Sequence, residues 1–407
     1  MTGPAPGSGV RAEAGGSGSP ALERCVGDPE AFLRDHWAVR PMHRAGGRAF
    51  DDLLSLDDVD HLLTEASLRL PAFRLVKDGA TLPTSGYTKS GQTGSQPVSG
   101  IADPPRVLER FRDGATIVLQ GMHRYWPPLS RFCRDLEAAL SHPAQVNAYI
   151  TPPGSRGLAV HQDSHDVFVL QAFGKKQWDV WSPRALGDPM PGPDEEPVLS
   201  VTLAPGDAMY LPLGTPHAAA TQSVLSGHLT VGILSTTWAR MLTDVLDGLA
   251  GEPSFREPLP AGYHRDPAGF AAAVKDRLGQ VARWLDGVDA QAAADRRIRS
   301  FLTTRLPLLG GALTDLAGLE DVGPETAVRR RAGSFCELRV EGDRLAVFLG
   351  DRELRMPLRL EPAMRMVAAA GPGEAFPARD LPGLSDEEST VVLVRRLVRE
   401  GLLEQAR

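Results

Sequence analysis

The segment from Asn147 to Trp181, together with a histidine beyond it, carries the residue types of a metal centre. His161 and Asp163 stand two residues apart in a run typical of a β-strand, where residues i and i+2 share one face. His217 follows in PGDAMYLPLGTPHAAA, after a predicted strand and turn. Two imidazoles and one carboxylate are the ligands of non-haem Fe(II) oxygenases, which keep coordination positions open for a co-substrate and dioxygen. The pattern therefore predicts an iron-dependent oxygenase.

Two further residues are candidates for holding an anionic co-substrate beside this metal. Lys176 lies fifteen residues after His161, and a buried lysine can serve as a point charge for a carboxylate. Asn147 lies fourteen residues before His161 and could hydrogen-bond the same ligand. Each residue alone has an ordinary explanation, since Lys176 follows Lys175 in a predicted turn and Asn147 could cap a strand. A lone His-x-Asp pair is also a weak signal, so the argument rests on the combination.

Short predicted strands surround these residues and must position them. They follow one another from Val146 to about Ser235 with Pro and Gly turns between them, and Gly114 to Met122 adds a buried strand. Many short strands with regular turn signals are typical of an all-β sandwich or barrel. The strands after Val146 are predicted in VNAYITP, LAVHQD, DVFVLQAF, KQWDVW, VLSVTLA, DAMYLP and HLTVGIL.

Helices and one long loop are predicted before the β-rich region. DPEAFLRDHWAVRPMHR has apolar residues at helical spacing until Pro41, and LSLDDVDHLLTEA predicts a helix with Ser55 as its N-cap. PPLSRFCRDLEAALSH predicts a third helix. The polar stretch from Pro83 to Pro97 predicts a long loop over a site, in which Tyr87 and Lys89 could contact substrate. A solvated, flexible loop would explain the same residues.

Helical periodicity replaces the strands after Ser235. β character returns from Ser334 to Leu360, and the residues from Glu361 to Arg407 predict a helix, a turn and a helix. Ser385 and Glu388 have the spacing of a capping box before the last helix. A helical pair beside short strands is consistent with a winged-helix fold. The helices directly after the β-rich region are predicted at Thr236–Leu249, Gly269–Leu285 and Ala290–Leu302.

Length and composition indicate a globular protein with two or three domains. The chain has 407 residues and a net charge of −7, which argues against a chain-wide nucleic-acid binder. Cys25, Cys133 and Cys336 are widely spaced, so no disulfide framework is expected and a reducing cytosol fits best. Residues 1–20 predict a disordered tail and lack the apolar segment of a signal peptide. No apolar run reaches the length of a membrane span.

From about Asn147 to Leu234 the sequence resembles the JmjC-type ribosomal oxygenases. The resemblance is carried by NAYITPPGSRGLAVHQDSHDVFVLQAFGKKQWDVW and by PGDAMYLPLGTPHAA. The family consists of Fe(II)- and 2-oxoglutarate-dependent protein hydroxylases of the cupin superfamily. The resemblance is weaker over FLRDHWAVRPM and over the regions after the barrel. It implies an α+β fold whose core is a double-stranded β-helix, the cupin or JmjC jelly roll.

The resemblance also implies the roles of single residues. His161, Asp163 and His217 match the iron ligands, and Lys176 matches the lysine that pairs with the C5 carboxylate of 2-oxoglutarate. Asn147 matches a polar residue near the co-substrate. The implied reaction couples the oxidative decarboxylation of 2-oxoglutarate by O2 to the hydroxylation of a substrate carbon. The strand LSGHLTVGIL matches the one that closes the co-substrate pocket, with Ser226, His228 and Thr230 as the candidate contacts.

Domain order and partners follow from the same resemblance. It implies a JmjC domain with N-terminal helices over residues 21–235, a helical dimerisation region over 236–325 and a winged-helix-like domain over 326–407. The implied substrate is a protein side chain, by analogy an Arg or His of a ribosomal protein. A homodimer in the cytoplasm, without a membrane partner, is expected.

Other functions stay open at the level of the sequence. A 2-oxoglutarate oxygenase acting on a peptide or small molecule in specialised metabolism would share every residue of the site, and a Zn or Mn cupin such as an isomerase is a further option. A non-catalytic cupin that binds DNA is opposed by the complete ligand set and by the acidic residues that flank Arg395, Arg396 and Arg399.

Four further residues, near the candidate ligands in the sequence, are polar or aromatic. His165 and Asp166 could be a second polar pair at the site, but we favour a role at the pocket rim or in orienting the strand. Trp178 and Trp181 are expected to pack the barrel.

Overall fold

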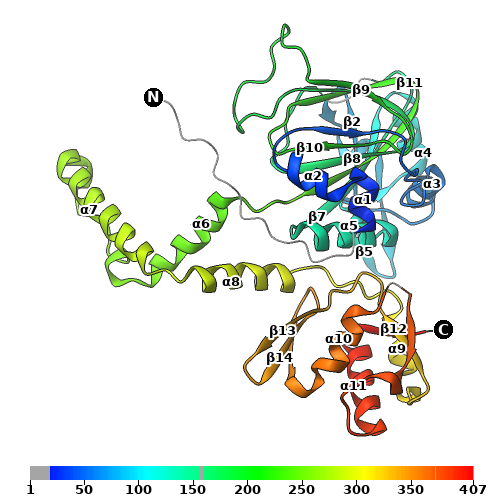
Figure 1. The fold of residues 1–407 in the computed structure, drawn as a ribbon. Coiled ribbons are helices and arrows are strands. Elements are labelled where there is room, and N and C mark those ends of the chain that lie inside the picture. Colours follow the sequence, from blue (N-terminus) through cyan, green and yellow to red (C-terminus); the bar gives the residue numbers. More distant parts are fainter. Residues whose placement is uncertain (1–18, 156–158, 372, 407) are drawn as a thin grey trace. The chain divides into compact units, whose positions relative to one another are not determined.

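A computed structural model describes residues 19–155, 159–371 and 373–406 of the chain (Figure 1). The predicted tail of residues 1–20 lies mostly outside this part. Its last two residues are ordered, because Ser19 caps helix α1 and Pro20 is the first residue of that helix. The chain forms two compact units, of which the first comprises Met1–Gln120, Asp135–Leu140 and Asn147–Val231 and the second comprises Gly121–Arg134, Ser141–Val146 and Gly232–Arg407.

A nine-stranded sheet carries one of the candidate ligands, His217, at the start of β11. Its order is β1-β10-β8-β11-β7-β6-β2-β3, with β9 paired to β8, and the described pairings are antiparallel. Most of the predicted strands are therefore confirmed, as is the buried strand after Gly114. The strands are β1 Met42–Arg44, β2 Phe73–Lys77, β3 Ala80–Thr81, β6 Thr116–Leu119, β7 Ala144–Thr151, β8 Asp166–Val180, β9 Leu199–Leu203, β10 Ala208–Leu211 and β11 His217–Ile233.

Helices beside this sheet begin at side-chain caps. Ser55 caps α3 in a capping box with Asp58, which confirms the predicted start of this helix. Helix α2 ends at Asp35, six residues before the predicted stop at Pro41. In Figure 1, α1 and α2 lie beside β10. The helices are α1 Pro20–Val26, α2 Pro29–Asp35, α3 Leu56–Thr64, α4 Pro104–Arg112 and α5 Pro127–Leu140, with short 3₁₀ turns η1 Thr84–Gly86 and η2 Met122–Arg124.

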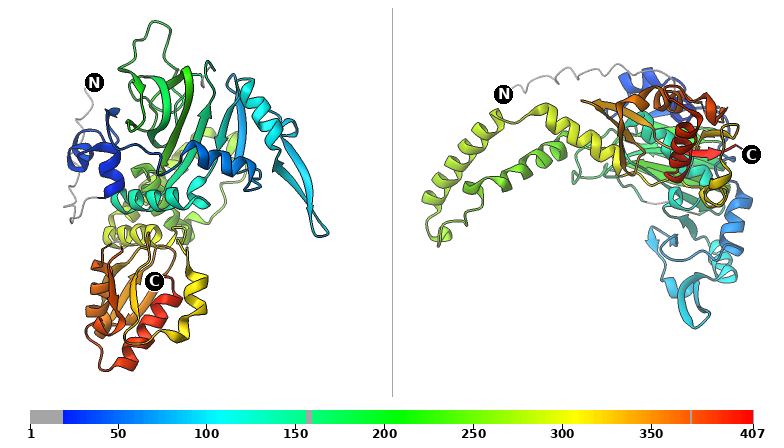
Figure 2. Two further views of the ribbon diagram at one scale, coloured as in Figure 1. Left: turned by 90° about the vertical axis from the view of Figure 1, so that its right-hand side faces the viewer. Right: turned by 90° about the horizontal axis from the view of Figure 1, so that it is seen from below.

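The stretch from Pro83 to Pro97 is not the long loop that its polarity predicts. It contains most of a β-hairpin, in which β4 (Thr88–Thr93) pairs with β5 (Gln96–Ala102) around a turn at Gly94, whose φ is +60°. A glycine adopts this backbone conformation without strain, so it permits a tight turn. Figure 2 shows the hairpin, in cyan, extending away from the large sheet.

Two predicted strands, DVFVLQAF and KQWDVW, are one continuous strand, β8. Gly174 bends it with φ +63°, and a Cβ there would lie 1.7 Å from the carbonyl oxygen of Leu225. Val167 and Val169 before the bend and Trp178 after it belong to one apolar cluster. Odd-numbered residues therefore face this cluster before Gly174 and even-numbered residues face it afterwards.

The second unit contains three helices followed by a small α/β part. Helices α6 and α7 have no buried residues. The elements are α6 Trp238–Leu246, α7 Pro267–Asp286, α8 Ala290–Thr303, α9 Ala312–Ala317, β12 Ala327–Arg330, β13 Glu337–Glu341, β14 Arg344–Phe348, β15 Glu353–Pro357, α10 Glu361–Ala369, β16 Ala375–Pro377, α11 Glu387–Arg399 and β17 Leu403–Gln405. Short 3₁₀ turns are η3 Asp247–Gly251, η4 Pro253–Phe255, η5 Tyr263–Arg265, η6 Leu319–Asp321, η7 Leu358–Leu360 and η8 Ala378–Asp380.

The small α/β part has its own core and two three-stranded sheets, β16-β12-β17 and β13-β14-β15. The start of its last helix differs from the prediction. Asp386, not Ser385, caps α11 by accepting a hydrogen bond from the backbone N–H of Ser389. Ser385 donates its hydroxyl to the same aspartate, so the capping box with Glu388 does not form.

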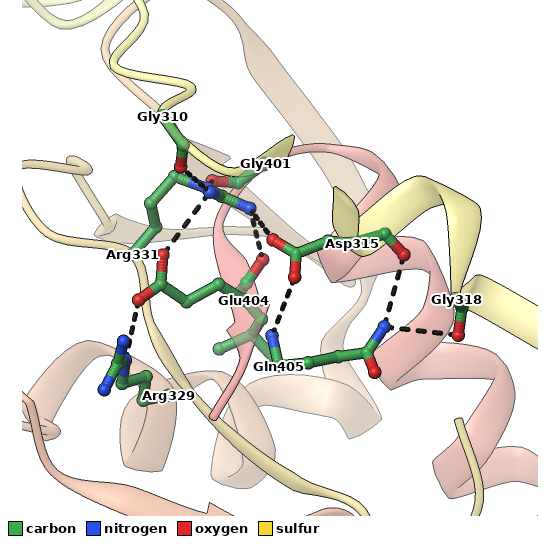
Figure 3. A network of polar contacts seen from close by, with 9 residues as sticks. Gly310, Asp315, Gly318, Arg329, Arg331, Gly401, Glu404 and Gln405 are labelled. Atoms are coloured by element: carbon green, nitrogen blue, oxygen red, sulfur yellow. Dashed lines mark hydrogen bonds and ion pairs between the residues drawn. The ribbon is translucent and has the colours of Figure 1, made fainter. Parts of the chain in front are cut away.

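A buried ionic network ties the last strand to α9 (Figure 3). Arg331 has 2% side-chain exposure and donates to Asp315 at 2.6 Å and to Glu404 at 3.3 Å. Arg329 contacts the same Glu404 at 2.6 Å, and Gln405 donates to the backbone of Asp315. Each buried charged group in this network has a partner of opposite charge, and burying such a group without a partner would cost free energy.

None of the helices that the structure describes has the length and apolar character needed to cross a membrane.

Candidate metal and co-substrate site

The first unit brings the three predicted metal ligands together. One ligand atom from each of His161, Asp163 and His217 lies within 4.8 Å of the others. His217 Nε2 is 3.8 Å from Asp163 Oδ2, and the two imidazole centroids are 4.3 Å apart. Two neutral nitrogens and one carboxylate oxygen thus converge on one point, from two segments distant in sequence.

The described part of LAVHQD, residues 159–163, forms no strand, so the prediction that His161 and Asp163 share a strand face was wrong. His161 forms an isolated β-bridge with His217, with backbone N–H to O distances of 3.1 Å and 2.9 Å. Gly214 N–H donates to the carbonyl of Asp163 at 3.0 Å. Gly214 has φ +75°, and a Cβ would lie 2.2 Å from the carbonyl oxygen of Arg184, so only glycine fits. The bridge between His161 and His217 and the turn at Gly214 therefore position the ligands in place of the predicted strand.

Both histidines turn the same ring nitrogen toward the metal point. Nδ1 of His161 lies 2.9 Å from the carbonyl of Ala159, and Nδ1 of His217 lies 2.9 Å from the carbonyl of Thr215. A carbonyl can only accept, which assigns the proton to Nδ1 and leaves the Nε2 lone pair for a metal. Burial, and next the neighbouring His161, lower the pKa of His217, which favours the neutral form that binds metals.

Lys176 is a buried cation on β8. It is 4% exposed, and Nζ lies 3.3 Å from the hydroxyl of Thr151, which is 3.2 Å from the hydroxyl of Thr116. Burial lowers the pKa of Lys176 to about 8. Lys176 forms no ion pair among the residues that the structure describes, whereas its neighbour Lys175 is exposed. A buried ammonium without a counter-ion is suited to an anionic ligand.

Aromatic rings connect the cation to the metal ligands. The Trp178 ring lies 5.9 Å from Lys176 Nζ and 6.0 Å from the ring of His217. His228 meets Trp178 edge to face at 5.3 Å and stacks on Tyr149 at 5.1 Å. Trp178 Nε1 and His228 Nδ1 are buried without a hydrogen-bond partner among the described residues. Burial, then Lys176, lower the pKa of His228 well below its usual value, so the ring is neutral.

The remaining candidates differ in their burial and in their contacts. Asn147 is half-buried on β7. Ser226, His228 and Thr230 share a face of β11, since they are two residues apart. Ser226 is fully buried and accepts a hydrogen bond from Gln171 at 3.0 Å. Thr230 is half-buried. Of these residues, His228 has the described contacts to the rings beside Lys176.

The other residues that the sequence singled out differ in their burial and in their hydrogen bonds. Asp166 is buried and accepts a hydrogen bond from the hydroxyl of Tyr210. Trp181 is half-buried and donates to the carbonyl of Glu195. Tyr87 is fully buried, in contrast to the exposed Lys89.

Tyr149 and Thr151 are site residues that sequence reasoning missed. Both follow Asn147 at intervals of two on β7, so they share its face of the sheet. This period could have identified them once Asn147 was a candidate. Burial raises the pKa of Tyr149, and the positive charge of Arg74 partly opposes this shift.

The chain is similar in sequence to a known domain family and to named oxygenases. The JmjC domain family matches residues 122–241. The chain is 26% identical to the bifunctional lysine-specific demethylase and histidyl-hydroxylase NO66 of Dictyostelium discoideum, over 91% of this chain and 78% of the relative. It is 28% identical to ribosomal oxygenase 1 of Gallus gallus, over 69% of this chain and 49% of the relative. The chain thus spans about half the length of this second relative.

Solved structures agree on the fold. The ribosomal oxygenase YcfD of Escherichia coli superposes with a TM-score of 0.54 at 18% identity, covering 93% of this chain and 98% of that chain. A structure of YcfD in complex with cobalt and 2-oxoglutarate superposes with a TM-score of 0.51 at 19% identity, covering 92% and 97% of the two chains. At this identity the likeness shows a common fold.

Proposed function

We propose that this chain is an Fe(II)- and 2-oxoglutarate-dependent dioxygenase that hydroxylates a protein side chain. The match of residues 122–241 to the JmjC domain family and the similarity to ribosomal oxygenases support this proposal. The observation that carries the proposal is the convergence of His161, Asp163 and His217 beside a buried Lys176. A metal and a dianionic co-substrate would each find the partners they require there.

The donor set fits Fe(II). His161 and His217 supply neutral nitrogens and Asp163 supplies one negative oxygen, so a divalent ion would keep positive charge for an anionic ligand. The Nδ1 contacts of the two histidines fix ring orientation before any ion binds.

The polar atoms around Lys176 fit 2-oxoglutarate. The ammonium would pair with the far carboxylate, with Thr151 beside it. Trp178 Nε1 and His228 are buried polar groups that a ligand could satisfy. We assign Asn147 to the same ligand as well, while Ser226 and Thr230, on the face of β11 that carries His228, would line the pocket.

When bound, iron and 2-oxoglutarate supply the oxygen chemistry: one atom of O2 enters a substrate C–H bond and the other enters succinate as CO2 leaves. The chain's own residues prepare the site. Lys176 would balance the charge of the far carboxylate and hold the co-substrate in one orientation. Trp178, His228 and Tyr149 form a packed aromatic wall that excludes water from the pocket.

For the substrate, we propose an Arg or His side chain of a ribosomal protein. The names of the relatives support this, since they include a histidyl-hydroxylase and ribosomal oxygenases. Co-expression with the organism's ribosomal proteins should give one protein whose mass increases by one oxygen atom. A mass increase only on a peptide or metabolite would favour the alternative role in specialised metabolism.

We also propose the domain order 21–235 for the JmjC jelly-roll domain, 236–325 for a dimerisation region and 326–407 for a winged-helix-like domain. A cleft of about 690 Å³ with mostly apolar walls lies among α6, α8 and the segment before α8. Trp238 and Leu242 on α6 are 82% and 55% exposed. A second copy of the chain would cover these side chains. A cytoplasmic location fits Cys25, Cys133 and Cys336, none of which forms a disulfide among the described residues.

The decisive test is an anaerobic titration of Fe(II) and 2-oxoglutarate. Wild-type protein should develop the weak visible charge-transfer band of the ternary complex, whereas Asp163→Ala should not, because two ligands hold the ion poorly. His161→Ala should also abolish 2-oxoglutarate turnover. Folded wild-type protein without a band, or full activity in either variant, would overturn the assignment.

A further inference from the structure

A buried carboxylate lies next to the candidate metal ligands without being one of them. Asp166 stands three residues after Asp163 and is 2% exposed. Its Oδ1 accepts a hydrogen bond from the hydroxyl of Tyr210 at 2.6 Å and from the backbone N–H of Leu213 at 3.3 Å. The two donors come from β10 and from the turn that follows it. This carboxylate therefore joins the HxD segment to the turn that leads into His217.

That turn fixes the position of His217. Leu213 is held by Asp166, and Gly214 donates to the carbonyl of Asp163 at 3.0 Å. The next residue, Thr215, offers the carbonyl that orients the imidazole of His217. Any shift of the turn would change where Nε2 of His217 points.

Tyr210 extends the connection to the N-terminal segment. It is 1% exposed, and its hydroxyl accepts a hydrogen bond from the backbone N–H of Ala38 at 2.9 Å. Ala38 has φ +57°, a conformation that a residue with a Cβ rarely adopts and that its surroundings must hold. The Tyr210 ring packs between Phe32, at 4.9 Å and edge to face, and Trp37, at 5.9 Å and stacked. Burial, followed by Asp166, raises the pKa of Tyr210, so the hydroxyl keeps its proton and remains a donor.

We propose that Asp166 and Tyr210 are positioning residues for the metal centre, which hold the turn of His217 and couple it to the segment around Ala38. The inference rests on the proposed function, because it concerns the geometry of the same ligands. It makes the N-terminal helices part of the metal site's support.

The test compares Co(II) affinity among four variants of the full chain, without 2-oxoglutarate or turnover. Asp166→Ala removes the acceptor and should lower the affinity about 10- to 100-fold, as loss of outer-shell partners does at other metal sites. Tyr210→Phe keeps the ring and should lower it by a smaller factor. Asp166→Asn keeps an acceptor oxygen and should recover most of the affinity, to within about fivefold of wild type.

Tyr87→Phe is the matched control. Tyr87 is also fully buried, but its hydroxyl has no hydrogen-bond partner among the described residues. Its loss should leave Co(II) affinity unchanged. A purely structural role of Asp166 would lower the unfolding temperature of the metal-free protein and leave the affinity of the folded fraction as in wild type.

The outcomes separate the two proposals. Wild-type affinity in folded Asp166→Ala, or no rescue by Asp166→Asn, would overturn the positioning role alone. If Asp166→Ala does not fold, Tyr210→Phe decides, because an unchanged affinity in that variant would overturn the coupling. Wild-type protein that binds no Co(II) would instead overturn the metal centre and this inference with it.

Discussion

At the scale of single residues, the proposed role of Lys176 predicts how 2-oxoglutarate binding depends on pH. Burial lowers its pKa to about 8, and only the ammonium form attracts a carboxylate. The dissociation constant of 2-oxoglutarate should therefore rise as pH increases through 8, by about tenfold between pH 7 and pH 9. Calorimetric titration of the Mn(II)-loaded protein measures this. Lys176→Ala should raise the 2-oxoglutarate requirement at pH 7 and retain the metal.

Lys176→Arg and Lys175→Ala are the controls for that experiment. An arginine stays charged across this range, so its dissociation constant should be flat with pH even if the affinity is lower. Lys175 is exposed, so its removal should be silent. An equal rise with pH in Lys176→Arg would show that another group titrates.

Gly214 is a second residue at which a substitution should change both metal affinity and stability. Gly214→Ala would require φ near +75° and would place Cβ 2.2 Å from the carbonyl of Arg184, so the turn must move. Strain of about 1–3 kcal/mol and a shifted His217 should lower metal affinity as well as stability. Gly192→Ala meets no atom within 4 Å and should change neither property. Metal titration and thermal unfolding of both variants check this, and wild-type metal binding by Gly214→Ala would refute it.

At the scale of elements, the network around Arg331 should dominate the stability of the small α/β part. Arg331→Leu would leave Asp315 buried without its ion pair, and breaking a buried pair in this way costs about 3–5 kcal/mol. Arg365→Ala is the matched control, since its ion pair with Glu361 is exposed and contributes about 0.3–0.5 kcal/mol. Denaturant unfolding gives both values. Equal losses in the two variants would contradict the importance of burial.

Element boundaries also show what the sequence could predict. Strand β7 and helix α3 were found because their signals are local: a period of two, and a capping serine. The prediction of a strand at LAVHQD was wrong, because His161 forms only an isolated bridge to His217, fifty-six residues later. Such a pairing is non-local and leaves no trace in the segment itself. The three candidate metal ligands could still be named, since their chemistry lies in their residue types, and the structure brings them together. The contact between Tyr210 and Asp166 depends on the fold and could not be predicted.

At the scale of the whole molecule, the exposed apolar side chains of α6 predict self-association. Trp238→Glu should convert a dimer into a monomer, because a charge would be buried in the interface. Light scattering on the purified chain measures the mass. Leu313→Glu is the control, since Leu313 is 84% exposed and lies outside the cleft lining. A wild-type monomer would refute the dimer, and an equal effect of Leu313→Glu would refute the location.

The bend at Gly174 determines which of the two adjacent lysines, Lys175 or Lys176, is buried. Strict alternation along β8 from Val167 would turn Lys175 toward the apolar cluster that contains Val167, and Lys176 toward the opposite face of the strand. The bend uses one extra residue, so the count shifts and Lys176 is the lysine that is 4% exposed. The bend therefore adds one residue to the chain between His161 and Lys176, and it is included in their spacing of fifteen residues. A homologous strand without this glycine would place its lysine in the same pocket at a spacing of fourteen.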